Sequence, residues 1–161
     1  MQEKQKLGNY RIHQTAYYGP YTCNKWPGRV MKQAIYFKTS MFDVSKEKEN
    51  PINPIYGISL LQWLRKELKG QFDITEPDAE DWGWYSELQY QGNSYLIGAC
   101  AYFEEGDDPA DELEWVFQVD KYRSLKEKLF GKNKMSVSDS CFVFFKAFFE
   151  NHPGIRDVQV G

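Results

Sequence analysis

Apolar and polar residues alternate along several stretches of the chain, and a period of two is typical of strands with one buried face. Gly92-Asn93 separates two of these stretches and is a two-residue turn signal, so the two are expected to pair as a hairpin. The pattern predicts strands at residues 33–41, 82–91, 94–104, 113–119 and 155–160.

A tight turn at Gly92-Asn93 also predicts the register of this hairpin, because Trp84 then lies opposite Ala101 and Ser86 lies opposite Ala99. Large rings opposite small residues are typical of the buried face of a strand pair. The small residues on this face would let a helix approach the sheet closely.

Apolar residues recur at helical spacing in three other segments. Residues 56–69 form an amphipathic pattern that ends near Gly70. Asp120 is a suitable N-cap for a short helix that would end at Gly131. Ser136-x-x-Asp139 resembles the start of a capping box and predicts a last helix, which Pro153-Gly154 would end. The apolar face of the short helix would consist of Tyr122, Leu125 and Leu129.

The elements follow the order β-α-β-β-β-α-α-β, which favours an α+β fold. Three consecutive strands form an antiparallel meander, and helices at both ends of it must cover its apolar face. We therefore expect a two-layer sandwich with a mostly antiparallel sheet of about five strands, covered on one face by two to three helices. Residues 31–161 would form this single domain, and residues 1–30 are expected to be an irregular or partly disordered extension, because they are polar and show no sustained period.

The composition favours a soluble domain with a core of aromatic rings. The 161 residues include five Trp, 11 Tyr and 11 Phe, and the net charge of −3 gives no reason to expect a nucleic-acid partner. No segment approaches about 18 uninterrupted apolar residues, so no membrane partner is expected either.

The three cysteines, Cys23, Cys100 and Cys141, are widely spaced and lack a Cys-x-x-Cys motif, which gives no basis for a zinc site or a disulfide framework. Cys100 and Cys141 lie in apolar stretches and are expected to be buried free thiols. Free thiols suit a reducing compartment, so we expect a cytoplasmic protein.

Residue patterns that carry catalysis are scarce. The histidines are His13, in the N-terminal extension, and His152, in a turn after the last predicted helix. No Gly-rich phosphate loop, nucleophile elbow or metal-binding His pair occurs. We therefore expect no enzyme activity, no catalytic residue, no cofactor and no metal.

Acidic residues gather at one end of the predicted hairpin, where its first strand begins and its second strand ends. They could keep the loops soluble and protect the strand ends, present a negative surface to a basic protein, or hold Ca²⁺. The calcium role is least favoured, because residues 104–109 lack the alternating ligand spacing of a known calcium loop. The candidate partner-binding residues, which we call the acidic rim, are Glu80, Asp81, Trp82, Glu104, Glu105, Asp107 and Asp108.

The paired tryptophans and the basic residues around the short predicted helix each have two interpretations. Trp82 and Trp84 are two residues apart on a strand and so point to one side, either as core anchors or, for Trp82, as an exposed anchor beside the carboxylates. The basic residues around the short predicted helix suit a solvated face better than a nucleic-acid surface, since few aromatic side chains accompany them. They are Lys121, Arg123, Lys126, Lys128, Lys132 and Lys134.

Glu80-Asp81-Trp82-Gly83-Trp84, the hairpin after it, Glu114-Trp115 and Leu129-Phe130-Gly131 resemble a family of small, uncharacterised bacterial domains, over residues 33–160. This resemblance implies no activity. Small acidic α+β proteins without catalytic residues are also similar in general character to immunity proteins, which neutralise toxins. We expect a non-enzymatic domain that binds a basic protein partner through its acidic, Trp-bearing rim, as an immunity protein does. The alternative is a small-molecule-binding domain with an aromatic pocket between helix and sheet.

Overall fold

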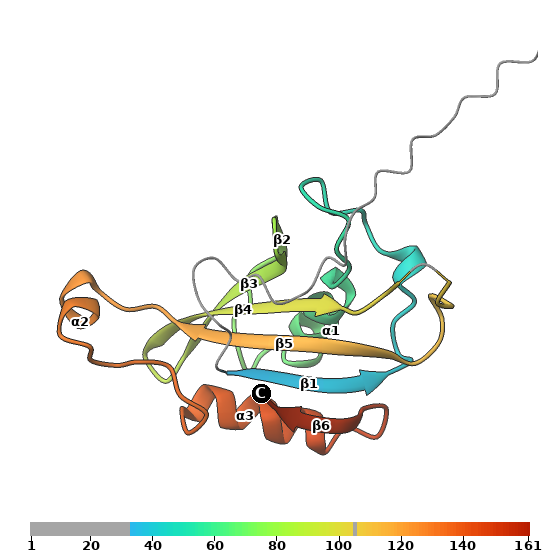
Figure 1. The fold of residues 1–161 in the computed structure, drawn as a ribbon. Coiled ribbons are helices and arrows are strands. Elements are labelled where there is room, and N and C mark those ends of the chain that lie inside the picture. The colour runs from blue at the N-terminus through green and yellow to red at the C-terminus, as the bar shows by residue number, and fades with distance from the viewer. Residues whose placement is uncertain (1–32, 105) are drawn as a thin grey trace, which may run out of the picture.

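The computed structural model describes residues 33–104 and 106–161, which form one six-stranded sheet with three α-helices (Figure 1). The strands lie in the order β2-β3-β4-β5-β1-β6, and all neighbours are antiparallel. In chain order the elements are β1 (Ala34–Thr39), the 3-10 helix η1 (Val44–Lys46), α1 (Ile58–Glu67), β2 (Asp78–Glu80), β3 (Gly83–Tyr90), β4 (Asn93–Ala101), β5 (Leu113–Lys121), α2 (Leu125–Leu129), α3 (Ser140–Glu150) and β6 (Arg156–Val160).

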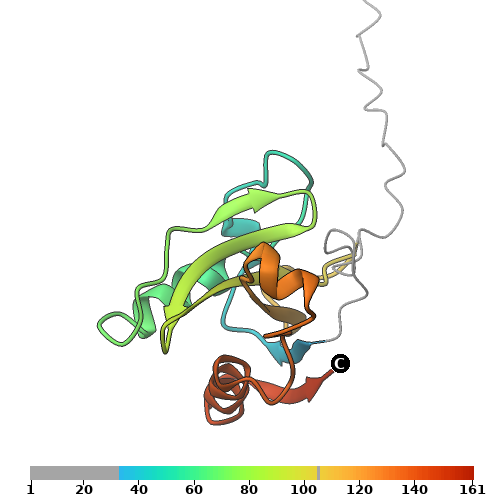
Figure 2. The same ribbon diagram turned by 90° about the vertical axis from the view of Figure 1, so that its left-hand side faces the viewer.

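This architecture confirms the predicted α+β class and the antiparallel sheet. The sheet has one strand more than expected, because the three-residue edge strand β2 pairs with β3. Its sequence, Asp78-Ala79-Glu80, is too short and too polar to show the alternation that predicts a strand. The two views of Figures 1 and 2 show α1 and α3 beside the sheet, with α2 set apart at the end of β5.

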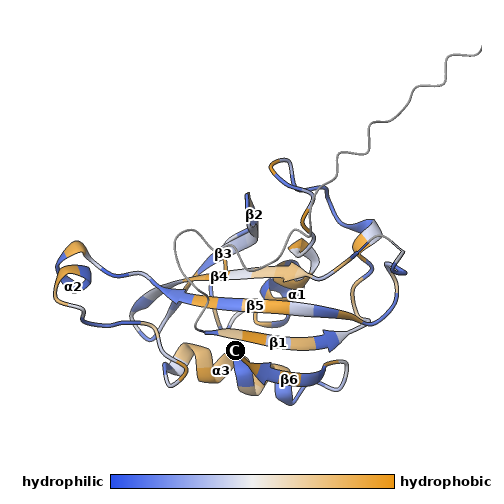
Figure 3. Ribbon diagram, viewed as in Figure 1, coloured by the Kyte–Doolittle hydropathy of each residue, from blue (hydrophilic) through white to orange (hydrophobic). Residues whose placement is uncertain are grey.

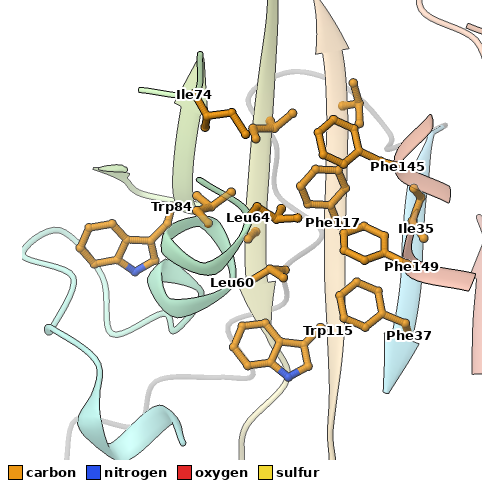
Figure 4. Close-up of a cluster of buried hydrophobic side chains, with 14 of the residues drawn as sticks. Ile35, Phe37, Leu60, Leu64, Ile74, Trp84, Trp115, Phe117, Phe145 and Phe149 are labelled. Atoms are coloured by element: carbon orange, nitrogen blue, oxygen red, sulfur yellow. The ribbon is translucent and has the colours of Figure 1, made fainter. Parts of the chain in front are cut away.

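Aromatic rings fill the space between the sheet and the helices α1 and α3, and α3 is mostly hydrophobic (Figure 3). The ring of Phe117, on β5, lies 4.8 Å from that of Phe145 and 5.1 Å from that of Phe149, both on α3 (Figure 4). Leu60 and Leu64 enter the same core from α1 and are fully buried. The predicted aromatic core is therefore confirmed.

The hairpin of β3 and β4 has the predicted core face and a register that differs by two residues. Trp84 lies opposite Ala99, and Ser86 opposite Ile97. The turn residues are Gln91 and Gly92, with φ angles of 47° and 76°, and not Gly92-Asn93. A two-residue hairpin turn that needs positive φ at both positions accepts glycine as its second residue. A shift of two residues keeps every side chain on its face of the sheet. The predicted core face is therefore correct although the predicted register is wrong.

The start of α1 lies directly against β4. Gly57 precedes the helix with a φ of 155°, and a Cβ atom at this position would lie 2.3 Å from the carbonyl oxygen of Ala99. The Glu47 carboxylate accepts hydrogen bonds from the backbone N–H groups of Gly57, at 2.7 Å, and Ser59, at 3.1 Å. The start of α1 thus approaches the sheet closely, and the missing side chain of Gly57 allows this contact with the backbone of β4.

The short helix α2 begins later than predicted. Asp120 belongs to β5, and the N-cap is Ser124, which forms a capping box with Glu127. No residue of α2 is buried, so α2 does not cover the sheet. The prediction of an apolar face on this helix was right, but that face contacts no part of the core.

The last helix, α3, begins at Asp139 and not at Ser136. The Asp139 side chain accepts the N–H of Cys141 at 2.9 Å, the hydroxyl of Tyr95 at 2.9 Å and the ammonium of Lys121 at 3.2 Å. The ammonium group also lies 5.4 Å from the centre of the Tyr95 ring. Burial and the neighbouring carboxylate raise the pKa of the Tyr95 hydroxyl. This partly buried group, which we call the Asp139 cluster, ties α3 to the start of β4 and the end of β5.

The other face of the sheet is also buried along its centre. Cys100 and Val116 are at most 2% exposed there, and Tyr36 and Tyr102 pack against them. The expectation of two free thiols was half right: Cys141 is free, but Cys100 is disulfide-bonded. An apolar environment suits a thiol and a disulfide equally, so the sequence did not distinguish them.

The predicted N-terminal extension, residues 1–30, lies outside the described residues. Within residues 33–104 and 106–161, no helix has the length and hydrophobicity needed to cross a bilayer.

Candidate functional site

The acidic rim is divided into two groups. Glu80, Asp81 and Trp82 lie where β2 turns into β3, and the exposed Glu104, Asp107 and Asp108 follow β4. Glu105 lies outside the described residues. Figure 1 shows the end of β2 and the connection from β4 to β5 at separate places on the molecule.

Residues 43–57 run between the two groups of the acidic rim. Asn50 Nδ2 donates to the carbonyl oxygens of Glu80, at 3.1 Å, and Gly83, at 3.0 Å. At the other end of this segment, the N–H of Val44 donates to the carbonyl of Pro109 at 3.2 Å. The prediction of one continuous rim was therefore wrong, because a loop that follows β1 occupies the space between the two hairpin ends.

Carboxylates of the second group shape their own loop. The side chain of Asp107 accepts the N–H of Glu104 at 2.8 Å, and the side chain of Asp108 accepts the N–H of Ala110 at 2.9 Å. Local bonds of this kind are common for aspartate in turns. These two residues therefore have a structural role in addition to any role in binding.

Trp82 lies on the face of the sheet opposite Trp84. It is 5% exposed, and its ring centre is 6.1 Å from that of Tyr85, whereas Trp84 belongs to the core under α1 and donates its indole N–H to the carbonyl of Ile55 at 3.0 Å. The prediction that both rings share one side was wrong, because Trp82 precedes β3 and the strand alternation does not extend to it. Gly83, with a φ of 147°, makes this change of direction possible.

A pocket of about 470 Å³ opens beside Trp82 on this face. Its lining comes from the end of β2 and the turn after it, from β3, β4 and β5, from the segment that leads into α2, and from α2 itself. We call it the Trp82 pocket. It is lined by Glu80, Trp82, Tyr85, Glu87, Leu96, Asp120, Lys121, Tyr122, Arg123 and Lys128.

Carboxylates dominate the electrostatics around the two phenols of this pocket. Burial raises the pKa of Tyr85, and the charges of Asp78, Glu80 and Glu87 raise it further. Burial and a 2.9 Å hydrogen bond to Glu87 raise the pKa of Tyr122 to about 12. A negative potential at both hydroxyl groups follows, since each nearby carboxylate disfavours the phenolate.

Three basic residues, Lys121, Arg123 and Lys128, also line the pocket. Arg123 Nη1 donates to the carbonyl of Lys132 at 3.4 Å. Lys121 is paired with Asp139 in the Asp139 cluster. Lys128 is exposed on α2. The lining thus combines three carboxylates and three aromatic rings with three basic side chains, of which Lys121 is already paired with Asp139.

The remaining candidates for chemistry are clusters of metal-ligating side chains and the two histidines. Among residues 33–104 and 106–161, no three His, Cys, Asp or Glu side chains lie together as a metal site would require. His152 has a structural role, since its Nδ1 accepts the N–H of Gly154 at 3.1 Å and its ring lies 5.0 Å from that of Trp63. His13 falls outside the described residues.

Eight of the ten residues that line the Trp82 pocket were not predicted as site residues; Glu80 and Trp82 are the two that were. Tyr85 and Glu87 alternate on β3, and Asp120 and Tyr122 alternate at the end of β5. On β3 the outward-facing Tyr85 and Glu87 offered a signal, a ring beside a carboxylate, whereas the outward-facing positions of β4 carry small or apolar residues and offered none.

Comparison of the chain with known protein families, with curated proteins and with solved structures finds no match. The resemblance to small bacterial domains therefore stays a prediction.

Proposed function

We propose that this chain is a non-enzymatic protein-interaction domain that binds a basic partner at the Trp82 pocket. The observation that supports this proposal is the gathering of Glu80, Glu87 and Asp120 around the rings of Trp82, Tyr85 and Tyr122. A ring face and a carboxylate both attract a cation, and the two effects strengthen each other where water is partly excluded. A lysine or arginine side chain of the partner is the group that suits this pocket.

The second group of the acidic rim would act at longer range. Glu104, Asp107 and Asp108 are exposed, and Glu105 adjoins them in the sequence. Exposed charges of this kind raise the association rate with an oppositely charged protein and contribute little to the dissociation rate. An immunity-type role, in which the basic partner is a toxin, is the form of this proposal that the sequence suggested.

A small-molecule ligand is the second candidate. The size of the Trp82 pocket is within the range of about 300–1,000 Å³ found for ligand sites. The space directly under α1 and α3 is filled by the core, and a second pocket of about 670 Å³, lined by Tyr90 of β3 and by Phe144 and Phe148 of α3, lies closer to the predicted place between helix and sheet than the Trp82 pocket does. A ligand of the Trp82 pocket would be a small organic cation, for the same electrostatic reasons.

A cytoplasmic location also stays a proposal, and the disulfide at Cys100 argues against it, since disulfides are rare in reducing compartments. Thiol titration of the unfolded protein before and after reduction tests the point. A cytoplasmic protein isolated without oxidation would show three thiols without any reductant, matching the three cysteines of the chain.

The interaction proposal is tested by NMR titration of the labelled protein with a lysine-rich peptide, and in parallel with a glutamate-rich peptide of equal length. We expect the basic peptide to shift the Trp82 indole signal and the amides of Tyr85 and Glu87, and the acidic peptide to leave them unchanged. Glu80→Gln combined with Glu87→Gln should weaken this response at least about tenfold, the loss expected for about 1.4 kcal/mol of binding energy.

A matched control replaces Glu104 and Asp108 by Gln and Asn. These changes remove the same charge at the second group of the acidic rim and should leave the equilibrium shift at Trp82 nearly unchanged. Equal weakening by both double variants would show that only net charge matters, and would overturn the pocket as the binding site.

A further inference from the structure

A segment between β5 and α3 projects from the body of the domain. It comprises residues 122–135 and contains α2, which Figures 1 and 3 show at one end of the molecule, beyond the end of β5. We call it the α2 arm. Its main chain is held by its own bonds, because the capping box of Ser124 and Glu127 begins the helix and the N–H of Lys132 donates to the carbonyl of Glu127 at 2.9 Å.

The apolar side chains of the α2 arm are exposed. Leu125 is 85% exposed, Leu129 81% and Phe130 63%, and Tyr122 is 49% exposed at the base of the arm. Single exposed apolar residues are common on soluble proteins, but a group of large ones on one short element is typical of an interaction site. The apolar face that the sequence predicted thus points into solvent.

Basic residues surround this apolar group. Residues 122–135 contain Arg123 and four lysines against the single acidic residue Glu127, which gives the arm a net charge of +4. Because the whole chain carries −3, the remaining residues carry −7. The arm is therefore a positive apolar projection on an otherwise acidic protein. The four lysines are Lys126, Lys128, Lys132 and Lys134.

These cations are not neutralised within the described part of the chain. The only acidic residue of the arm, Glu127, accepts the N–H of Ser124 at 2.8 Å and the side-chain amide of Asn133 at 2.5 Å, and these bonds lower its pKa. None of the ion pairs among residues 33–104 and 106–161 includes a lysine of the arm. Lys126, Lys132 and Lys134 therefore remain available to an external partner, and Lys128 does so while it also lines the Trp82 pocket.

We infer that the α2 arm docks on an anionic lipid surface, with Leu125, Leu129 and Phe130 below the headgroups and the lysines at the level of the phosphates. Leucine and phenylalanine beside lysine is the composition of elements that lie in a membrane interface. A bilayer accepts a convex tip, whereas a protein partner would need a groove shaped for it. The absence of a long apolar segment, which led us to expect no membrane partner, does not bear on docking of this kind.

The charge distribution also sets the orientation of the docked domain. Each basic residue close to an anionic leaflet contributes about a fivefold gain in affinity, the equivalent of about 1 kcal/mol, and acidic residues are repelled. The acidic remainder of the protein would therefore face away from the membrane, with the arm toward it. Docking would not use the Trp82 carboxylates.

Co-sedimentation of the full chain with lipid vesicles tests this inference. We expect binding to phosphatidylcholine vesicles that contain about 30 mol% phosphatidylserine, and at least about tenfold weaker binding to phosphatidylcholine alone. Leu125→Asn combined with Phe130→Asn should reduce binding to the anionic vesicles at least about fivefold by removing buried apolar area. Both side chains are exposed, so the far-UV circular dichroism and the unfolding midpoint should not change.

Two control variants separate specific docking from general attraction. Lys126→Gln, Lys128→Gln and Lys132→Gln together should reduce binding at least about tenfold, whereas the same change at the exposed Lys48, Lys66 and Lys69 should reduce it less than about threefold. Ile52→Asn, at an exposed apolar residue away from the arm, should have no effect. Absence of binding to anionic vesicles would overturn the inference and would leave an acidic protein as the partner that binds the α2 arm. Equal losses from the arm variants and the control variants would also overturn it.

Discussion

Replacement of Asp139 by alanine should destabilise the domain far more than the loss of an ordinary helix cap. The Asp139 side chain is 10% exposed, and its partner Lys121 is 14% exposed. Loss of the N-cap alone costs about 1 kcal/mol. The substitution also leaves the ammonium group of Lys121 and the hydroxyl of Tyr95 without their acceptor. Breaking a fully buried ion pair from one side costs about 3–5 kcal/mol, and this partly buried pair should cost less. We expect a total loss of about 2–4 kcal/mol in the free energy of unfolding.

The assay is urea unfolding followed by tryptophan fluorescence, with the slope m compared among variants to exclude a change of unfolding mechanism. Ser124→Ala is the matched control, because Ser124 caps α2 in an exposed capping box without buried partners and should cost about 1 kcal/mol or less. Asp139→Asn keeps an oxygen for the cap and removes the charge, so it should fall between the two. If Asp139→Ala costs no more than Ser124→Ala, the Asp139 cluster contributes only a cap and the reasoning is refuted.

Three further predictions concern packing and pH. Ala101→Leu should cost about 1–3 kcal/mol by overpacking beside Trp115 under α1, whereas Val143→Leu, on the exposed side of α3, should be neutral in the same unfolding assay. Gly57→Ala should cost about 2 kcal/mol more than Gly70→Ala, because both glycines have positive φ but only Gly57 meets backbone within 3 Å; equal costs would mean that the contact with Ala99 relaxes freely. Burial raises the pKa of the Cys141 thiol to about 12, whereas the same thiol in the unfolded chain ionises near its ordinary value of 9.0. The contribution of this thiol to the free energy of unfolding should therefore be fully present below pH 9 and be lost as the pH rises from 9 toward 12. Cys141→Ala should flatten this decline between pH 9 and pH 10, where the buried hydroxyl of Tyr95 does not yet contribute, and an unchanged slope would contradict the assignment.

Local patterns predicted most of the fold, because alternation and helical spacing depend on near neighbours. The core face of the hairpin was predicted although its register was two residues off, since the two registers differ in partners and not in faces. The turn at Gln91-Gly92 was missed because Asn93 next to a glycine suggested a turn one residue later. The N-cap at Ser124 was missed because Asp120 is an equally good cap in sequence, and only the pairing of β5 with β4 assigns it to a strand.

The candidate site was predicted less well, because it depends on where distant segments run. Nothing in residues 43–57 indicates that they separate the two groups of the acidic rim, and Asn50 contacts Glu80 only through main-chain carbonyls. Trp82 was assigned to the wrong face of the sheet, since a two-residue turn and Gly83 reverse its direction. Exposure of the α2 arm was missed because its apolar spacing is that of a core helix.

The two outer strands of the sheet limit how the protein can aggregate. β2 has three residues and carries carboxylates at both ends, and β6 is interrupted by a bulge at Asp157, whose φ of 54° breaks the pairing with β1. Short, charged or bulged edges offer a poor template for another strand. Edge-to-edge growth of this sheet into fibrils is therefore disfavoured, even at high protein concentration.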